Sequence, residues 1–459
     1  MNAEQLPLMP EKEPSSWLDV KEAFFNSKVA KSFERLERTF GSKVEISAFA
    51  KLVNTSISSK QPFHRWVRYR EGYAGDLVKE ILRRYPVRIG KDYVVDPMSG
   101  SGSTLIACKE VGIDSIGLDV NPFAVLAGNV KGVRYSKKAL SDILQVFEAV
   151  IKLPLKTGPF NNSNYLAKYF PSKNYKVLVS IKKRLEEVRK GFVKDFVKLA
   201  LLSILEDCSN RKKDGNGLAT RPAPCSDPVA RLSEQIQMMI YDVECSNHPS
   251  CTSICFDQSA TQLYPFLRNY SKKKEMSIGG FIFSPPYANS FDYFESYKLE
   301  ILFGDYFSIE DFQDARSRLI RNFRLGKTQS ESRFKLVEDL CSEVSKAIIR
   351  KEKMTGIRDG RTRLVPNMLR AYFEDMAQVI EGTYKTLRKG CSTHIVIDQS
   401  AYAGIPIPTD LIFAEIGQQI GFNVEEIIEC RRANTSGQQL KVFPYLKTML
   451  RESIVSLVK

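Results

Sequence analysis

The sequence predicts an α/β fold, and three observations point to it. Two short apolar stretches, Asp92–Asp96 and Ser115–Asp119, have the length of buried strands, and a helical stretch over Ser103–Val111 lies between them. Two later stretches, Thr252–Phe256 and Gly280–Phe283, repeat the strand pattern. A strand, a loop, a helix and a second strand form the β-loop-α-β unit of Rossmann-like sheets, which carry helices on both faces.

Helices are predicted before this unit. Residues 15–60 read as helical and partly charged, with a loop at Thr55–Ser59. Residues 72–85 place apolar side chains on one helical face, and Pro86 ends that helix because the residue before a proline avoids the helical region.

Helical insertions interrupt the alternation of strands and helices. Residues 173–189 and 191–207 are strongly helical, and 209–228 reads as a polar loop with the basic cluster Arg211–Lys213. Residues 305–365 are rich in arginine and lysine. The pattern then resumes with helices at 369–387 and 409–420 and strands at 394–398, 425–430 and 453–458.

These stretches predict four regions along the chain. They are an N-terminal helical region (1–60), a catalytic α/β domain in two pieces (61–130 and 251–459), a helical insertion (131–250) and, within the second piece, a basic insertion (305–365).

Composition favours an anionic partner. The 459 residues carry a formal net charge of +15, which favours nucleic acid, although a merely basic surface is the alternative. Nine scattered cysteines fit a reducing compartment better than a disulfide framework. No signal peptide or apolar run long enough to span a bilayer is found, so we expect a cytoplasmic protein without a membrane partner.

The stretch Ser284-Pro285-Pro286-Tyr287 follows a predicted strand. Neither proline donates a backbone hydrogen bond, so the strand ends in a stiff turn. The carboxyl edge of such a sheet is where ligands bind. The turn offers a hydroxyl, carbonyl oxygens and an aromatic ring, which suit a flat, amine-bearing ring.

A second candidate site is the loop from Asp96 to Thr104, with glycines at 100 and 102. Glycines let the backbone approach a ligand, and the following helix offers free N–H groups. The spacing matches neither a Walker A loop nor the dinucleotide pattern, and a tight turn without a ligand is the alternative. Asp119, at the end of the next strand, is placed to accept from ribose hydroxyls, whereas an ordinary capping or solvated Asp is the other interpretation. Together, loop and Asp119 predict a nucleoside-containing cofactor.

Asp257 ends the strand over 252–256. In this topology it lies beside the base of such a cofactor and could accept from an exocyclic amine. An N-cap for the following helix is an equally good interpretation.

Together these motifs resemble the S-adenosylmethionine-dependent amino-methyltransferases of DNA, in which a D-P-F-x-G-S-G-T loop binds the cofactor and a [D/N/S]-P-P-[Y/F/W] turn binds the target base. The first residue of the turn, Ser284, is typical of cytosine-N4 enzymes. Met98 stands where the family usually has Phe, and the loop precedes the turn, whereas many cytosine-N4 enzymes have the reverse order. Residues 63–85 resemble the helix that closes over the methionine moiety.

The resemblance implies a Rossmann-like class I methyltransferase sheet and a set of site residues. The implied catalytic residues are Ser284, Pro285, Pro286 and Tyr287. The implied cofactor-binding residues are Asp96, Pro97, Met98, Gly100, Gly102, Thr104, Asp119, Asp257 and Phe283.

The implied reaction is methyl transfer from S-adenosylmethionine to the N4 amine of cytosine in double-stranded DNA, in a restriction–modification system whose endonuclease acts separately. Hydrogen bonds from the amine to Ser284 Oγ and the Pro285 carbonyl would localise its lone pair, and Tyr287 would stack on a base turned out of the duplex. Adenine-N6 methylation, methylation of an RNA base amine and an inactive nucleic-acid-binding homologue are the alternatives. DNA binding would place the protein on the nucleoid.

Two weaker signals accompany these motifs. Cys245, His248, Cys251 and Cys255 lack the spacing of common zinc sites, so no metal is expected. The basic residues of 311–363 are a candidate DNA-contacting module, with a solvated helical face as the alternative. Further candidates for DNA contact are Arg211–Lys213, Thr220–Arg221, Arg431, Arg432, Gln438 and Gln439.

Overall fold

The protein is a mixed α/β structure built on one eight-stranded sheet. The computed structural model describes residues 16–54, 58–69, 72–152, 154–156, 158, 162–189, 191–214, 217–274, 277–288, 292–321, 331–433 and 437–459. Across the sheet the strands follow the order β1 (Ser42–Val44), β11 (Asn423–Arg432), β12 (Arg451–Val458), β8 (Leu387–Asp398), β7 (Ser277–Phe283), β2 (Asp92–Asp96), β3 (Asp114–Asp119) and β6 (Ser253–Asp257).

Parallel pairing dominates the sheet. The strand β12 runs antiparallel to both of its neighbours, β11 and β8, and every other neighbouring pair is parallel. In the register, Val95 of β2 lies between Ile116 of β3 and Phe281 of β7, and Asp119 lies beside Asp257 of β6. The carboxyl ends of β2, β3, β6 and β7 therefore meet at one edge.

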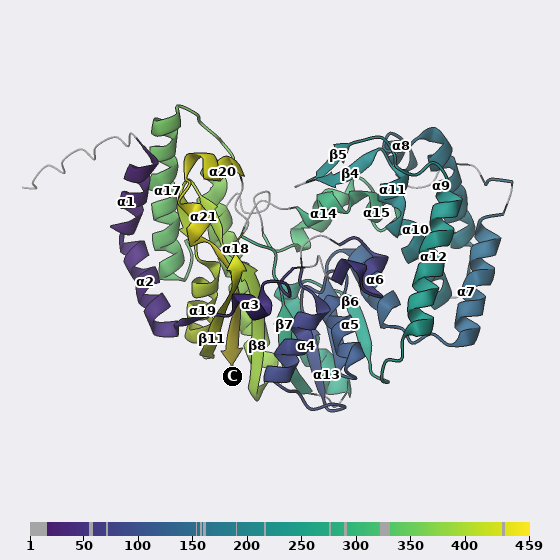
Figure 1. Cartoon of the computed structure of the whole chain (residues 1–459), viewed down its shortest axis with the longest axis horizontal. Helices are drawn as coiled ribbons and strands as arrows, with labels where there is room; N and C mark the ends of the chain where they lie inside the picture. Colours follow the sequence, from purple (N-terminus) through teal and green to yellow (C-terminus); the bar gives the residue numbers. More distant parts are fainter. Residues whose placement is uncertain are drawn as a thin grey trace, which may run out of the picture.

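Helices cover both faces of the sheet (Figure 1). One face packs against α3 (Ile46–Phe49), α4 (Gly75–Arg84) and α5 (Ser103–Glu110), with α6 (Pro122–Gly132) beside α5. The other face packs against α13 (Leu263–Lys274), α18 (Val365–Thr386) and α19 (Thr409–Ile420). A further layer of α1 (Trp17–Phe25), α2 (Lys28–Phe40) and α17 (Lys335–Thr355) lies outside α18 and α19.

A second body, which we call the helical lobe, stands beside the sheet (Figure 1). Its elements share one hydrophobic cluster, with Phe196, Leu201 and Phe303 fully buried. It consists of α7 (Lys137–Val150), α8 (Ser163–Ala167), α9 (Ser172–Glu186), α10 (Gly191–Ser203), α11 (Leu205–Cys208), the hairpin β4 (Arg211–Asp214) and β5 (Gly217–Thr220), α12 (Pro228–Cys245), α14 (Tyr293–Ser296), α15 (Lys298–Phe303) and α16 (Asp311–Ala315).

Several elements differ from the sequence predictions. The stretch 209–228 contains the hairpin β4–β5, in which two short strands that are close in sequence pair with each other. Residues 42–44 form β1 because they pair with β11, which is distant in sequence. A second small hairpin joins β9 (Ser400–Tyr402) and β10 (Ile405–Ile407), and the short helices α20 (Gly437–Val442) and α21 (Leu446–Met449) precede β12. The loop predicted at Thr55–Ser59 falls partly outside the described residues.

The packing also cuts across the predicted regions, whose boundaries stay a prediction. Within 305–365, α16 packs into the helical lobe, whereas the buried face of α17 shares the hydrophobic cluster of the sheet. The N-terminal helices α1 and α2 contribute to that same cluster. In the part of the chain that the structure describes, no helix has both the length and the apolar character needed to cross a membrane.

Candidate functional site

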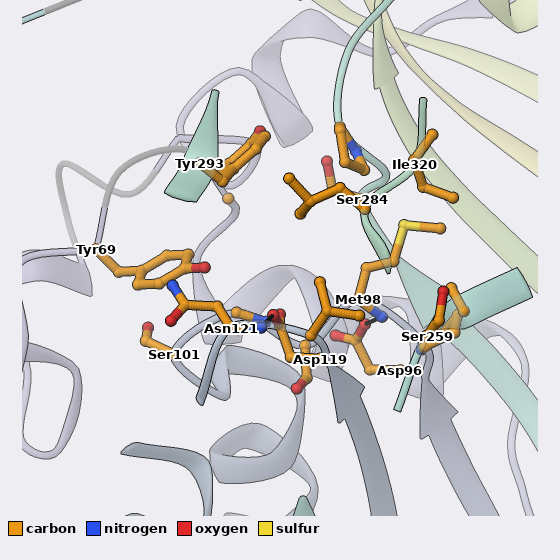
Figure 2. Close-up of a pocket in the computed structure, with 18 of the residues that line it drawn as sticks. Tyr69, Asp96, Met98, Ser101, Asp119, Asn121, Ser259, Ser284, Tyr293 and Ile320 are labelled. Carbon is orange, nitrogen blue, oxygen red and sulfur yellow. Dashed lines mark hydrogen bonds between the residues drawn. The ribbon is translucent and has the colours of Figure 1, made fainter. Parts of the chain in front are cut away.

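A cavity lies at the carboxyl ends of β2, β3, β6 and β7 (Figure 2). The space between its walls, including a part that is open to solvent, is about 970 Å³. Of the residues predicted from sequence, its lining includes Asp96, Pro97, Met98, Gly100, Asp119, Ser284, Pro286 and Tyr287. Gly102, Thr104, Asp257, Phe283 and Pro285 are not part of that lining.

The buried carboxylate of Asp96 organises the start of the loop. It accepts hydrogen bonds from Met98 N (3.0 Å), Thr104 Oγ1 (2.5 Å) and Tyr73 OH (3.1 Å). Burial raises the pKa of Asp96 to about 7, although the three donors oppose that shift. Thr104 does not line the cavity, but its hydrogen bond holds the Asp96 side chain that does.

The loop glycines are required by conformation and by close approach. Gly100 has φ +48°, and a Cβ there would lie 2.8 Å from the ring of Tyr69. Gly102 has φ +87°, and its Cβ would lie 3.3 Å from the Cα of Gly128 in α6. Both values of φ disfavour other residues, and Gly100 also leaves room for an aromatic ring.

Asp119 holds the same loop from β3. Its two carboxylate oxygens accept from Gly100 N and Asn121 N, each at 2.8 Å. Desolvation raises the pKa of Asp119 to about 6, and the charge of Asp257 adds to this effect. Each oxygen keeps a second lone pair, so the carboxylate can still accept a hydrogen bond from a ligand in the cavity.

The Ser284–Tyr287 turn faces the loop across the cavity (Figure 2). No described residue forms a hydrogen bond with the side chain of Ser284, so its hydroxyl is available to a ligand. Tyr287 OH donates to Glu452 Oε1 of β12 at 3.4 Å, and Tyr402 OH donates to the Ala288 carbonyl at 2.9 Å. The turn is therefore supported from behind.

Asp257 is not an N-cap, so that interpretation was wrong. Ser259 occupies the N-cap position of the short helix after β6 (Ala260–Gln262), and Asp257 instead forms an ion pair with Arg318. Its expected contact with the base of a cofactor stays a prediction, and the adjacent Gln258 lines the cavity.

Arg318 belongs to a segment that we call the arginine strap, residues 316–321, which crosses the edge of the cavity. Ser259 Oγ donates to the Arg318 carbonyl at 2.9 Å. At either end, Arg316 pairs with Glu295 of the helical lobe (2.5 Å) and Arg321 pairs with Asp375 of α18 (2.7 Å). Between these two ion pairs, Arg318, Leu319 and Ile320 all line the cavity.

Sequence reasoning missed several lining residues, among them Tyr69, Asn121, Ser259, Tyr293 and Ile320. Tyr69 stacks on Tyr297 of the helical lobe, with ring centroids 4.6 Å apart and an interplanar angle of 10°. The sequence pointed to the region of Tyr69 only through the resemblance of residues 63–85 to the helix that covers the cofactor. The other positions carry no local motif and reach the cavity through tertiary packing.

A buried carboxylate anchors the chain just before Tyr69. Asp242 of α12 accepts from Phe63 N (3.0 Å), Arg65 Nε (3.1 Å) and Trp66 Nε1 (2.8 Å). The helical lobe thereby fixes one wall of the cavity.

Comparison with known proteins gives a consistent result. The type II methyltransferase M.AvaI from Nostoc sp. is 27% identical over 444 residues, with 90% of each chain covered. The chain is similar to type II methyltransferases. M.BsoBI from Geobacillus stearothermophilus is 24% identical, with 88% of this chain and 87% of the relative covered. M.MjaII from Methanocaldococcus jannaschii is 41% identical over 76 residues, 17% of this chain and 14% of that protein. No family model matches the chain.

The similarity to these methyltransferases extends into both predicted insertions. The match to M.AvaI leaves only a tenth of the chain uncovered. Both insertions, 131–250 and 305–365, are longer than that tenth, so the match must include at least part of each. The motif resemblance alone did not reach these regions.

Many of the candidate DNA-contacting cations are paired inside the protein. Arg350 pairs with Glu343 (3.1 Å) and Arg363 with Glu352 (2.6 Å). Lys213 is buried and pairs with Glu300 (2.5 Å), and Arg431 pairs with Glu452. Gln438 lies in α20, although its side chain is outside the described part. A DNA-contacting role for the basic stretch stays a prediction.

Among the described residues, no group of three or more His, Cys, Asp or Glu side chains is arranged to hold a metal ion. The cysteines at issue lie in different surroundings. Cys255 is buried with its Sγ 3.2 Å from Ser99 Oγ, whereas Cys245 is exposed at the end of α12.

Proposed function

We propose that this chain transfers a methyl group from S-adenosylmethionine to the exocyclic N4 amine of cytosine in double-stranded DNA. The observation that carries the proposal is the shared cavity, into which β3 brings Asp119 and β7 brings Ser284. The similarity to type II methyltransferases over most of the chain supports the reaction class and a restriction–modification setting. A separately acting endonuclease belongs to this proposal, as does action at the nucleoid.

The cavity fits the proposed cofactor chemically. Its floor offers the backbone of the loop and the carboxylate of Asp119, which suit ribose hydroxyls, and Met98 and Ile320 add apolar surface. When bound, the sulfonium group would supply an already activated methyl group. We also propose that the sheet is of the Rossmann-like class I methyltransferase type.

The protein's part in the reaction is to position and polarise the amine. Ser284 Oγ, which lines the cavity, would accept a hydrogen bond from one amine N–H. The Pro285 carbonyl, whose residue is not part of that lining, would have to turn toward the other N–H to accept from it. Both bonds would draw the nitrogen lone pair away from the ring and toward the methyl group. Tyr287 would stack on the base and hold it in line. The choice of cytosine rests on Ser284 in the first position of the turn.

The decisive experiment is incubation with labelled S-adenosylmethionine and DNA of mixed sequence, followed by mass spectrometry of the nucleosides. N4-methylcytosine supports the proposal, N6-methyladenine overturns the choice of base, and transfer to RNA alone overturns the choice of nucleic acid. No product with any substrate, together with retained DNA binding, favours an inactive homologue. Ser284→Ala should remove the product while leaving cofactor binding intact.

A further inference from the structure

Lys131 lies in the last turn of α6, beneath the cavity loop. Its side chain is 1% exposed, and its Nζ donates to the Ser101 carbonyl at 2.8 Å. Lys131 itself is not part of the cavity lining, whereas Ser101 is. The carbonyl bonded to it is therefore turned toward α6 and away from the ligand space.

In the part of the chain that the structure describes, no carboxylate compensates this buried amine. Among the described residues, Lys131 has no ion-pair partner, and burial lowers its pKa to about 7. Keeping an ionisable group in such a place is unfavourable for folding. A methionine of similar length would fill the space at less cost, so stability does not explain the lysine.

Apart from the contact between Ser99 Oγ and Cys255 Sγ and the local backbone bonds to the Ser99 and Gly102 carbonyls, the other described hydrogen bonds of loop residues 97–102 are made by their N–H groups. Met98 N donates to Asp96 and Gly100 N donates to Asp119, while Ser99 N donates to the Leu118 carbonyl at 2.9 Å. No other described side chain reaches a carbonyl oxygen of residues 97–102. Lys131 thus supplies a constraint on the loop that its other contacts do not.

We propose that Lys131 is a positioning residue that holds the Ser101 carbonyl away from the ligand space and so shapes the loop for S-adenosylmethionine. This inference rests on the proposed function. The Ser101–Gly102 peptide is also held at Gly102 N, which donates to the Ser99 carbonyl at 2.8 Å, so the loss of Lys131 releases its carbonyl side. Because glycine tolerates many conformations, part of the loop must then be reordered when the cofactor binds.

The matched control is Lys198. It also donates its Nζ to a backbone carbonyl, that of Gly304 at 3.1 Å, and burial also lowers its pKa. It lies in α10 of the helical lobe and does not line the cavity.

The test compares Lys131→Met and Lys198→Met with the wild type by calorimetric titration with S-adenosylmethionine and S-adenosylhomocysteine. At pH 6 the Lys131 amine is protonated, and a hydrogen bond to a charged group stabilises by about 1.5–3 kcal/mol, so Lys131→Met should weaken both affinities roughly 10- to 150-fold at that pH. The value of kcat at saturating cofactor should change by less than about threefold, because the lost interaction is made equally in ground and transition states. Lys198→Met should bind like the wild type.

Hydrogen exchange gives the second measurement. Peptides covering 97–102 should exchange faster in unliganded Lys131→Met, while peptides from β2 and β3 keep their protection. If Lys131→Met loses protection throughout the sheet, the variant is misfolded and Lys131→Arg, which keeps the donor and the charge, replaces it as the test. Lys131→Arg must then bind S-adenosylmethionine within about threefold of the wild type, and a weaker affinity shows that the inference is wrong. Equal affinity of Lys131→Met and wild type also overturns it. A wild-type protein that binds neither ligand overturns the proposed function as well.

Discussion

Arg318 forms an ion pair with Asp257, and this pair joins the arginine strap to the carboxyl end of β6. The two side chains are 35% and 49% exposed, so the pair itself adds little to folding stability. Arg316, in contrast, is only 3% exposed where it meets the helical lobe. The arginine strap is therefore firmly held at Arg316, whereas the Arg318–Asp257 ion pair in its middle is partly exposed to solvent beside the cavity.

Arg318→Gln should loosen the wall formed by residues 318–320, and change one lining side chain, without unfolding the protein. We expect a change of less than about 1 kcal/mol in the free energy of unfolding, since exposed pairs contribute little. The affinity for S-adenosylmethionine should fall about 3- to 10-fold. Arg363→Gln is the control, because Arg363 pairs with Glu352 away from the cavity. Equal affinities of the two variants would show that the strap does not shape the site.

Gly100→Ala should weaken cofactor binding, and the effect should be larger than the strain of an alanine at a positive φ alone would cause. The added Cβ would meet the Tyr69 ring at 2.8 Å, so the ring or the loop must move. Gly356→Ala has a similar positive φ with no atom within 4 Å, and it should cost only about 1 kcal/mol of stability. Titration with S-adenosylmethionine and thermal unfolding of both variants separate the two effects. Normal binding by Gly100→Ala would mean that Tyr69 moves freely.

Tyr287→Ala should lower kcat/KM for DNA methylation by roughly 5- to 150-fold, which corresponds to the 1–3 kcal/mol typical of stacking on one base. Tyr287→Phe keeps the ring and removes only the hydroxyl that reaches Glu452, so it should retain most activity. Initial rates with labelled cofactor measure both. Full activity in the alanine variant would exclude the ring from base binding.

The buried lysine predicts a pH dependence of stability. The pKa of Lys131 is lowered from 10.5 to about 7 in the folded state, so between these values the unfolded chain binds more protons and this group's contribution to stability rises with pH. Lys131→Met lacks this contribution. Its free energy of unfolding minus that of the wild type should be largest near pH 6 and fall toward pH 9.5, by about 1.4 kcal/mol per pH unit at most. Denaturant unfolding at several pH values measures it, and a constant difference would contradict the shift.

The parts of the fold that sequence predicted are those with local causes. The strand over 92–96 and the helix over 409–420 match the structure residue for residue, because a short apolar run and an amphipathic pattern each define their own ends. The loop and the Ser284–Tyr287 turn were likewise visible, since glycine and proline act on the local backbone.

The remainder depends on partners distant in sequence. Tyr69 reaches the cavity wall because it stacks on Tyr297, and Asp257 receives Arg318 from another segment altogether. In the same way, the apolar face of α17 within a basic stretch became informative only when it packed against α18. A run of charged residues or an N-cap pattern depends only on residues that are close in sequence. Such patterns therefore cannot predict contacts between segments that are far apart in the chain.

The three-residue strand β1 has a consequence for aggregation. Among the described strands it pairs only with β11, and its Lys43 side chain is 63% exposed beside Glu426. Short, charged edge strands discourage the pairing of sheets from different molecules. Replacing residues 42–44 with a sequence that does not pair would leave residues 427–429 of β11 as an open edge, and the expected result is self-association in solution.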